Sequence, residues 1–134
     1  MKSGLVSSLL LTILLTGLLT SSGEAEAISY ILTLDDPNGG ENIFGGTDFD
    51  IRLTTSVSGG VLVLSYSTDG GATYPNEITT ISNAGGAQVT VWNVPNNVDT
   101  TSARVHVEWR SQAASPYTVY RTDQSNGNFS ITPS

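Results

Sequence analysis

Apolar residues recur at every second position along most of the chain after Ile28. The clearest run is residues 47–55, where Phe49, Ile51 and Leu53 alternate with charged or hydroxyl side chains. A period of two predicts a β-strand with one buried face, because successive side chains point to opposite sides. Turn-forming Gly, Asn, Pro and Ser interrupt the pattern about every eight to twelve residues, a spacing typical of a β-sandwich. We therefore predict an all-β protein.

Eight segments carry this strand pattern. They are residues 28–34, 47–55, 61–67, 77–82, 87–95, 103–109, 117–121 and 128–132. The third of them, VLVLSYS, is apolar on both faces at its start. Such a segment is either a central strand or a strand whose second face meets another chain. The sequence leaves both interpretations open.

Two glycine-rich segments predict turns. In residues 35–42, a proline fixes one backbone torsion and a glycine pair supplies positive φ. In Ser65–Pro75, SYSTDGGATYP, a second glycine pair follows Asp69 and predicts a tight hairpin. The Asp69 carboxylate is expected to shape this turn by accepting hydrogen bonds, with no part in chemistry. Tyr66 and Tyr74, on either side of it, are expected to pack on the same side.

The first residues have the three-part pattern of a secretory signal peptide. The apolar core Leu5–Thr20 falls short of the about 18–20 residues that a spanning helix needs. Ala25–Ala27 fits the small-x-small cleavage rule, so residues 1–27 are predicted as a signal peptide and residues 28–134 as one domain. The predicted location is extracellular or at the cell surface, with no membrane insertion after cleavage. The alternative is an uncleaved N-terminal anchor.

The chain is acidic, with a net charge of −7, and has no cysteine. An acidic surface repels phosphate groups, so nucleic acids and anionic membranes are poor partners. Without cysteine an exported chain forms no disulfides. Packing, strand hydrogen bonds, assembly or bound ions must stabilise it instead.

His106 is the only histidine, and alternation places it between Arg104 and Glu108 on the polar face of its strand. No nearby serine lies in a nucleophile motif such as G-x-S-x-G, and one histidine without cysteine cannot supply a zinc site. We therefore interpret His106 as a solvated residue of a sheet face. Paired carboxylates occur, but a small sandwich offers them no apolar cleft of the kind that glycosidases use. The sequence predicts no enzymatic activity.

Acidic residues gather in and just after the first predicted turn. They are Asp35, Asp36, Glu41, Asp48 and Asp50. Calcium prefers carboxylate and loop carbonyl oxygens, so we hypothesise that these residues bind calcium. The alternative is a solvated acidic rim. No other cofactor is predicted.

One N-glycosylation sequon occurs, at Asn128-Phe129-Ser130. Alternation points Asn128 outward if Phe129 lies in the core. Both a used site and a chance match remain open.

Five segments, taken in order, form a wider pattern. They are DDPNGGENIFGGTDFDIRL (35–53), LSYSTDGGATY (64–74), VWNVP (91–95), SARVHVEW (102–109) and DQSNGNFSI (123–131). Together they resemble the N-terminal Ig-like module of the KRE/KNH cell-wall proteins of fungi, the Ser-Thr-rich GPI-anchored membrane family, which recurs in prokaryotic surface proteins. The resemblance implies an Ig/fibronectin-III-like antiparallel β-sandwich of about seven to eight strands and no catalytic residues. Leu53 stands where the family usually has Trp, so no sugar-stacking role carries over to it.

Two functions of different classes fit these observations. The first is a structural or adhesive cell-surface protein, with assembly into filaments by strand donation as one route. The donated strand would present one face of residues 28–34, made of Ile28, Tyr30, Leu32 and Leu34. The alternative is that this segment is an ordinary strand of a monomer. The second function is a cell-wall or glycan-binding module that stacks sugars on Tyr66, Tyr74, Tyr117 and Tyr120.

Overall fold

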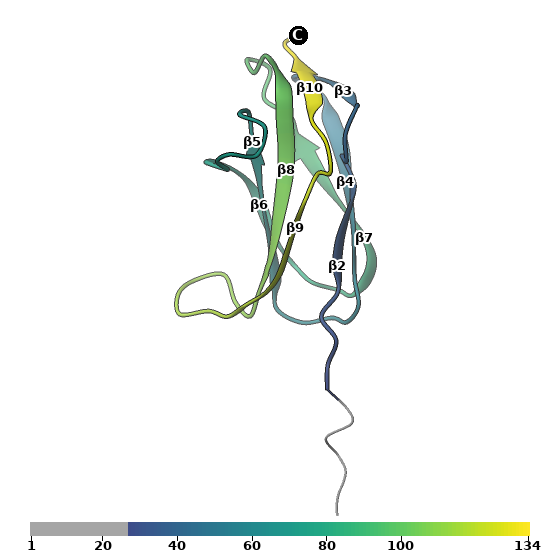
Figure 1. Ribbon diagram of the computed structural model, residues 1–134, viewed down its shortest axis with the longest axis vertical. Coiled ribbons are helices and arrows are strands. Elements are labelled where there is room, and N and C mark those ends of the chain that lie inside the picture. Colours follow the sequence, from purple (N-terminus) through teal and green to yellow (C-terminus); the bar gives the residue numbers. More distant parts are fainter. Residues whose placement is uncertain (1–26) are drawn as a thin grey trace, which may run out of the picture.

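The computed structural model describes residues 27–134, so the predicted signal peptide lies almost entirely outside the described residues. Two sheets pack face to face (Figure 1). The nine strands of the described residues are β2 (Leu32–Asp36), β3 (Asn42–Phe44), β4 (Asp48–Thr55), β5 (Val61–Ser67), β6 (Asn76–Ser82), β7 (Gly86–Asn93), β8 (Thr100–Arg110), β9 (Val119–Gln124) and β10 (Phe129–Thr132). Residues 27–134 contain no helix long and apolar enough to cross a membrane.

The smaller sheet has three strands in the order β2-β4-β7. The larger sheet has six, in the order β3-β10-β8-β5-β6 with β9 also paired to β8. Neighbours are antiparallel except β10 and β3, which are parallel. This confirms the predicted Ig/fibronectin-III-like antiparallel sandwich. The nine strands exceed the seven to eight predicted, because three-residue β3 is held by pairing with β10 and has no local pattern of its own.

The core fills the space between the sheets. Its buried apolar side chains are Leu34, Ile43, Ile51, Leu53, Leu62, Leu64, Tyr66, Trp92, Val94, Ala103, Val105, Val107, Trp109, Phe129 and Ile131. Segment 61–67 forms β5 between β6 and β8, with Leu62 and Leu64 in the core and Val61 and Val63 half-buried on the outer face. The interpretation of this segment as a central strand is therefore confirmed.

Side chains close the hairpin that follows β5. The Asp69 carboxylate accepts hydrogen bonds from the Ser67 hydroxyl and from the backbone N–H (3.0 Å) and hydroxyl (2.6 Å) of Thr73. The hydrogen bond from Ser67 has the largest effect, and together these bonds lower the pKa of Asp69 to about 2. The prediction that Asp69 shapes the turn is confirmed. The expected packing of Tyr66 and Tyr74 on one side is wrong, because Tyr66 is buried in the core and Tyr74 covers the outer face of the larger sheet.

Candidate functional surfaces

Four of the five predicted calcium ligands surround one shallow hollow. It is lined by Asp36, Glu41, Asp48, Phe49, Asp50 and Arg52. Asp35 is exposed on β2 and accepts a hydrogen bond from the Thr54 hydroxyl at 2.8 Å. Among residues 27–134, no three side chains of His, Asp or Glu form a group that could hold a metal ion.

Three of the carboxylates at the hollow have partners within the protein. Glu41 accepts bonds from two backbone N–H groups of the preceding turn, both at 2.8 Å. Asp48 accepts a hydrogen bond from the Asn93 side-chain amide at 2.9 Å. The carboxylate of Asp50 forms an ion pair with the guanidinium of Arg52, with Oδ2 and Nη2 3.5 Å apart. These acids close a turn and link neighbouring side chains. The calcium hypothesis gains no ligand set from this geometry and stays a prediction.

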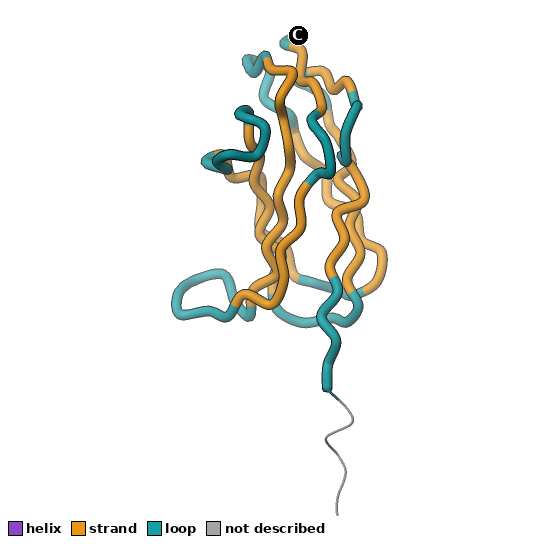
Figure 2. The backbone as a smooth tube through the Cα atoms, in the orientation of Figure 1, coloured by secondary structure: helices purple, strands orange, loops and turns teal. Residues whose placement is uncertain are grey.

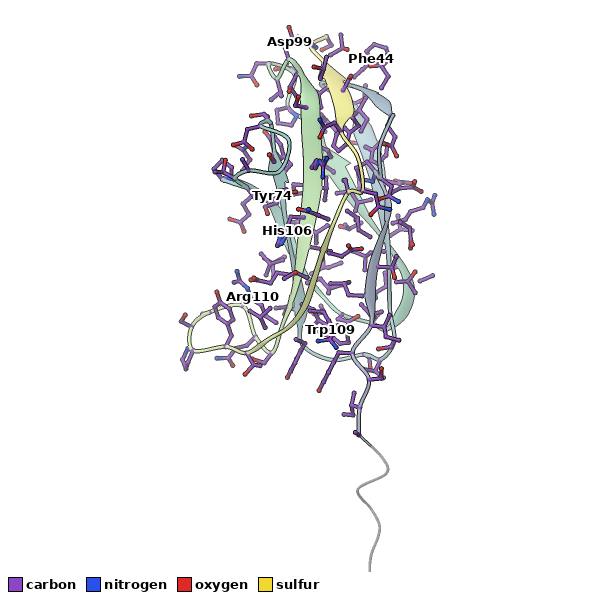
Figure 3. The ribbon with its side chains drawn as sticks, in the orientation of Figure 1. Phe44, Tyr74, Asp99, His106, Trp109 and Arg110 are labelled. Atoms are coloured by element: carbon purple, nitrogen blue, oxygen red, sulfur yellow. The ribbon has the colours of Figure 1, made fainter. Side chains whose placement is uncertain are left out.

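A groove of about 460 Å³ lies on the outer face of the larger sheet. It is lined by Val63, Leu64, Ser65, Tyr74, Pro75, Glu77, Thr80, Arg110, Ala113 and Ala114. The loop between β8 and β9, which contributes two alanines to the groove, projects from the sandwich in Figure 2. Figure 3 shows Tyr74, His106 and Arg110 on the outer side of β8 and Trp109 on its inner side.

Arg110 fixes the loop that borders this groove. Its Nε donates to the Glu108 carboxylate, and its Nη1 donates to the carbonyl of Ala113 at 3.1 Å. The guanidinium also lies 4.1 Å from the centroid of the Tyr117 ring, within the range of a cation–π contact. The loop wall of the groove is therefore held by side chains of the protein itself.

His106 lies half-buried beside Tyr74, whose ring centroid is 4.9 Å from that of the imidazole. The Tyr74 hydroxyl donates to the Gln124 side chain at 2.7 Å, which holds the tyrosine in place. Burial lowers the pKa of His106, and the charges of Glu108 and Asp123 act in the opposite direction. His106 therefore lies on a sheet face as expected but is less exposed to solvent than expected, because Tyr74 from a loop distant in sequence covers part of it.

We expect His106 to make the protein less stable as the pH falls below about 6.5. The pKa of His106 is lowered in the folded state, so the unfolded chain binds the proton first. Its contribution is complete above the unfolded pKa and is lost as the pH falls toward the folded pKa. Urea unfolding at about pH 7.5, 6.5 and 5.5 measures the loss. His106→Gln, which does not titrate, should lose less stability over this range, and an equal loss would contradict the prediction.

The tyrosines considered for sugar stacking do not form one exposed platform. Tyr66 is 7% exposed in the core, and Tyr120 stacks on Tyr30 with ring centroids 4.4 Å apart. Tyr117 faces a guanidinium group, and Tyr74 lines the groove. Tyrosines engaged in this way favour a structural role over a flat sugar-binding surface.

The predicted assembly strand lies partly in the domain's own sheet. Leu32 and Leu34 belong to β2 and pair with β4, and Leu34 is 1% exposed. Tyr30 precedes the strand and packs edge-on against Trp109, with centroids 5.1 Å apart. Ile28 is 61% exposed in the segment that extends away from the sandwich (Figure 1). Donation of residues 28–34 would therefore require β2 to leave β4.

Within the described residues, β7 is one of the two outer strands of the smaller sheet, so one of its edges has no partner strand. β7 exposes Val89 (51%) and Val91 (56%) on its outer face. Sequence reasoning missed this surface. The available signal was that segment 87–95 has apolar residues in both phases of the alternation, Val89 and Val91 in one and Trp92 and Val94 in the other.

Asn128, the residue of the sequon, is exposed immediately before β10. Its side-chain oxygen accepts a hydrogen bond from Nε of Arg104 at 2.7 Å. Its exposure agrees with the outward direction expected from alternation, and glycosylation stays a prediction.

A scan of the sequence against models of protein families found no match, and a search of curated proteins found none either. The resemblance to the KRE/KNH module therefore stays a prediction, and the functional argument rests on the geometry.

Proposed function

We propose that the protein is an extracellular, non-catalytic structural or adhesive subunit of the cell surface that associates with further copies of itself. The supporting observation is the β7 edge, an eight-residue strand with a partner on one side and two exposed valines. Unpaired apolar edges are templates for pairing with another chain, and stable monomers normally protect them. The exposed edge therefore favours assembly.

Two ionisable side chains of β8 near the groove, Glu108 and His106, are already engaged. Arg110 binds Glu108, and Tyr74 covers His106. A general acid or base must reach the proton that it transfers in a bound substrate. The engagement of these side chains supports a non-catalytic role.

A filament cannot form through self-pairing of the β7 edge alone. A contact that pairs the same surface of two copies closes a dimer, whereas a second contact, such as a head-to-tail one, lets dimers join into a filament. Strand donation by Ile28–Leu34 is our proposal for that second contact. It requires β2 to exchange between copies, because Leu34 is already buried in its own core.

Cell-wall glycan binding is the second candidate, and the groove favours it. Tyr74 offers an aromatic surface beside the Glu77 carboxylate and the hydroxyls of Ser65 and Thr80. An aromatic ring with a few convergent polar groups is the arrangement that orients a small ligand. Titration with soluble wall oligosaccharides, read by chemical-shift changes, should move the signals of these four residues if this role holds. Tyr74→Ala should abolish such shifts.

Molar mass in solution tests the main proposal directly. The exported chain is examined by light scattering after size exclusion over a concentration series, with and without calcium. Self-association predicts that the mass rises above that of the monomer as the concentration increases. A monomer at every concentration would contradict the proposal and favour the glycan-binding role.

A further inference from the structure

The edges of the two sheets differ in how well they are protected. In β2, the backbone N–H of Leu34 donates to the Asp123 carboxylate at 2.7 Å, and the strand ends in two acidic residues. β3 has three residues. β6 carries Glu77 and a register shift against β5, and β9 carries Arg121 and Asp123 and a register shift against β8. Charges, bulges and short length are devices that keep an edge from pairing with other chains.

β7 lacks these devices. Its eight residues include no charged side chain and no proline, and it pairs with β4 along its whole length without a register shift. Two of its outward side chains, Val89 and Val91, are exposed valines at alternate positions. Regular pairing on one side leaves the other side of β7 straight enough to accept a further strand.

We propose that two copies of this chain pair through β7, antiparallel about a two-fold axis at Thr90, so that their smaller sheets join. This interface rests on the self-association proposed above and names where it occurs. In this register Val89 of each copy lies opposite Val91 of the other. Side chains directly opposed in antiparallel strands have Cβ atoms about 4.5–5.5 Å apart and stabilise the sheet. The apolar side chains on the outer face of β7 in one copy thus match those of the second copy.

The strand next to β7 carries charges that suit this partner and register. Within one copy, Val89 pairs with Arg52 and Val91 pairs with Asp50 across the ladder between β4 and β7. Pairing about Thr90 therefore produces rows in which the two valines are flanked by Arg52 on one side and by Asp50 of the second copy on the other. An axis at Val91 would instead place an aspartate on both sides of the two central valines. In a chain of net charge −7, β7 itself carries no charged side chain, which lowers the repulsion that a second copy meets there.

Sedimentation velocity of the exported chain over a concentration series measures the dissociation constant of the dimer. Val91→Lys is expected to raise this constant at least about tenfold, because it places a charge in the centre of the joined sheet. Thr80→Lys, at an exposed position of the β6 edge, is the matched control and should change the constant less than about twofold. Both positions are exposed in the monomer, so both variants should fold, and thermal unfolding checks this.

A disulfide tests the register independently. The chain has no cysteine, so Val89→Cys combined with Val91→Cys introduces its only thiols. Opposed positions on neighbouring strands are close enough for a disulfide, and oxidation should give a covalent dimer on a non-reducing gel. The control combines Thr80→Cys with Ser82→Cys at exposed positions of β6 and should stay monomeric.

The outcomes separate this interface from the general proposal. A wild-type chain that stays monomeric at every concentration overturns both. A wild-type chain that associates, but is weakened by Thr80→Lys and not by Val91→Lys, overturns the β7 interface and leaves self-association standing. Loss of association in Val91→Lys, with a covalent dimer from the pair at positions 89 and 91, supports the interface and its register.

Discussion

Replacing Trp109 with alanine is expected to lower the free energy of unfolding by about 3–5 kcal/mol. The indole is 1% exposed and packs edge-on against Tyr30 at 5.1 Å and Tyr120 at 5.7 Å between ring centroids. Its Nε1–H also donates to the carbonyl of Gly59 at 2.9 Å. Alanine would remove these contacts and leave a cavity that the surrounding strands cannot fill. The loss is a large part of the about 5–15 kcal/mol typical of a native domain.

Urea unfolding followed by circular dichroism measures this loss. Phe44→Ala is the matched control, because Phe44 is 53% exposed on β3 at the opposite end of the sandwich (Figure 3), and it should cost less than about 1 kcal/mol. Equal losses in the two variants would contradict the central place of Trp109 in the core. If the alanine variant does not fold, Trp109→Phe removes the indole N–H and should still cost about 1–3 kcal/mol.

The longer strands were predictable because alternation is a local signal. β4 and β5 begin and end within one residue of the predicted segments 47–55 and 61–67. β3 gave no such signal, because its three residues are ordered by parallel pairing with β10 from the far end of the chain. The first strand was predicted to start at Ile28 and starts at Leu32, since the alternation continues where β4 no longer provides a pairing partner.

The surroundings of individual side chains were less predictable, because they depend on strand register and on loops that fold back. Alternation placed His106 on the outer face correctly, but the Tyr74 cover comes from the loop after β5. The carboxylate of Asp48 meets Asn93 only because of the register between β4 and β7. In β7, two apolar phases compete, and the larger Trp92 is buried while the valines face outward.

A buried asparagine at the turn after β6 holds one end of this cysteine-free sandwich. Asn83 is 5% exposed, and its side-chain amide makes five hydrogen bonds that join the β4–β5 loop, the β6–β7 turn and β7. The partners are the Thr55 hydroxyl (2.7 Å), the Gln88 amide (2.9 Å), the Gly85 N–H (3.0 Å) and the carbonyls of Val57 (2.9 Å) and Gly59 (3.1 Å). Gly60 completes this corner, because a side chain there would collide with the carbonyl of Arg110 at 2.2 Å.

Asn83→Ala is expected to cost about 1–3 kcal/mol, because the buried Thr55 hydroxyl would lose its acceptor and a buried polar group left without a partner costs about that much. Asn93→Ala is the control in the same unfolding experiment. Asn93 is exposed, and among the described side chains its amide bonds only that of Asp48. Asn93→Ala should therefore lower the free energy of unfolding by less than about 1 kcal/mol. Equal losses in the two variants would contradict the prediction.

The carbonyl of Gly59 accepts hydrogen bonds from both Asn83 and Trp109, so these two residues are coupled. The loss of unfolding free energy in the Asn83→Ala, Trp109→Ala double variant should differ from the sum of the two single losses by about 0.5–3 kcal/mol. A strictly additive loss would show that the two residues stabilise the fold independently.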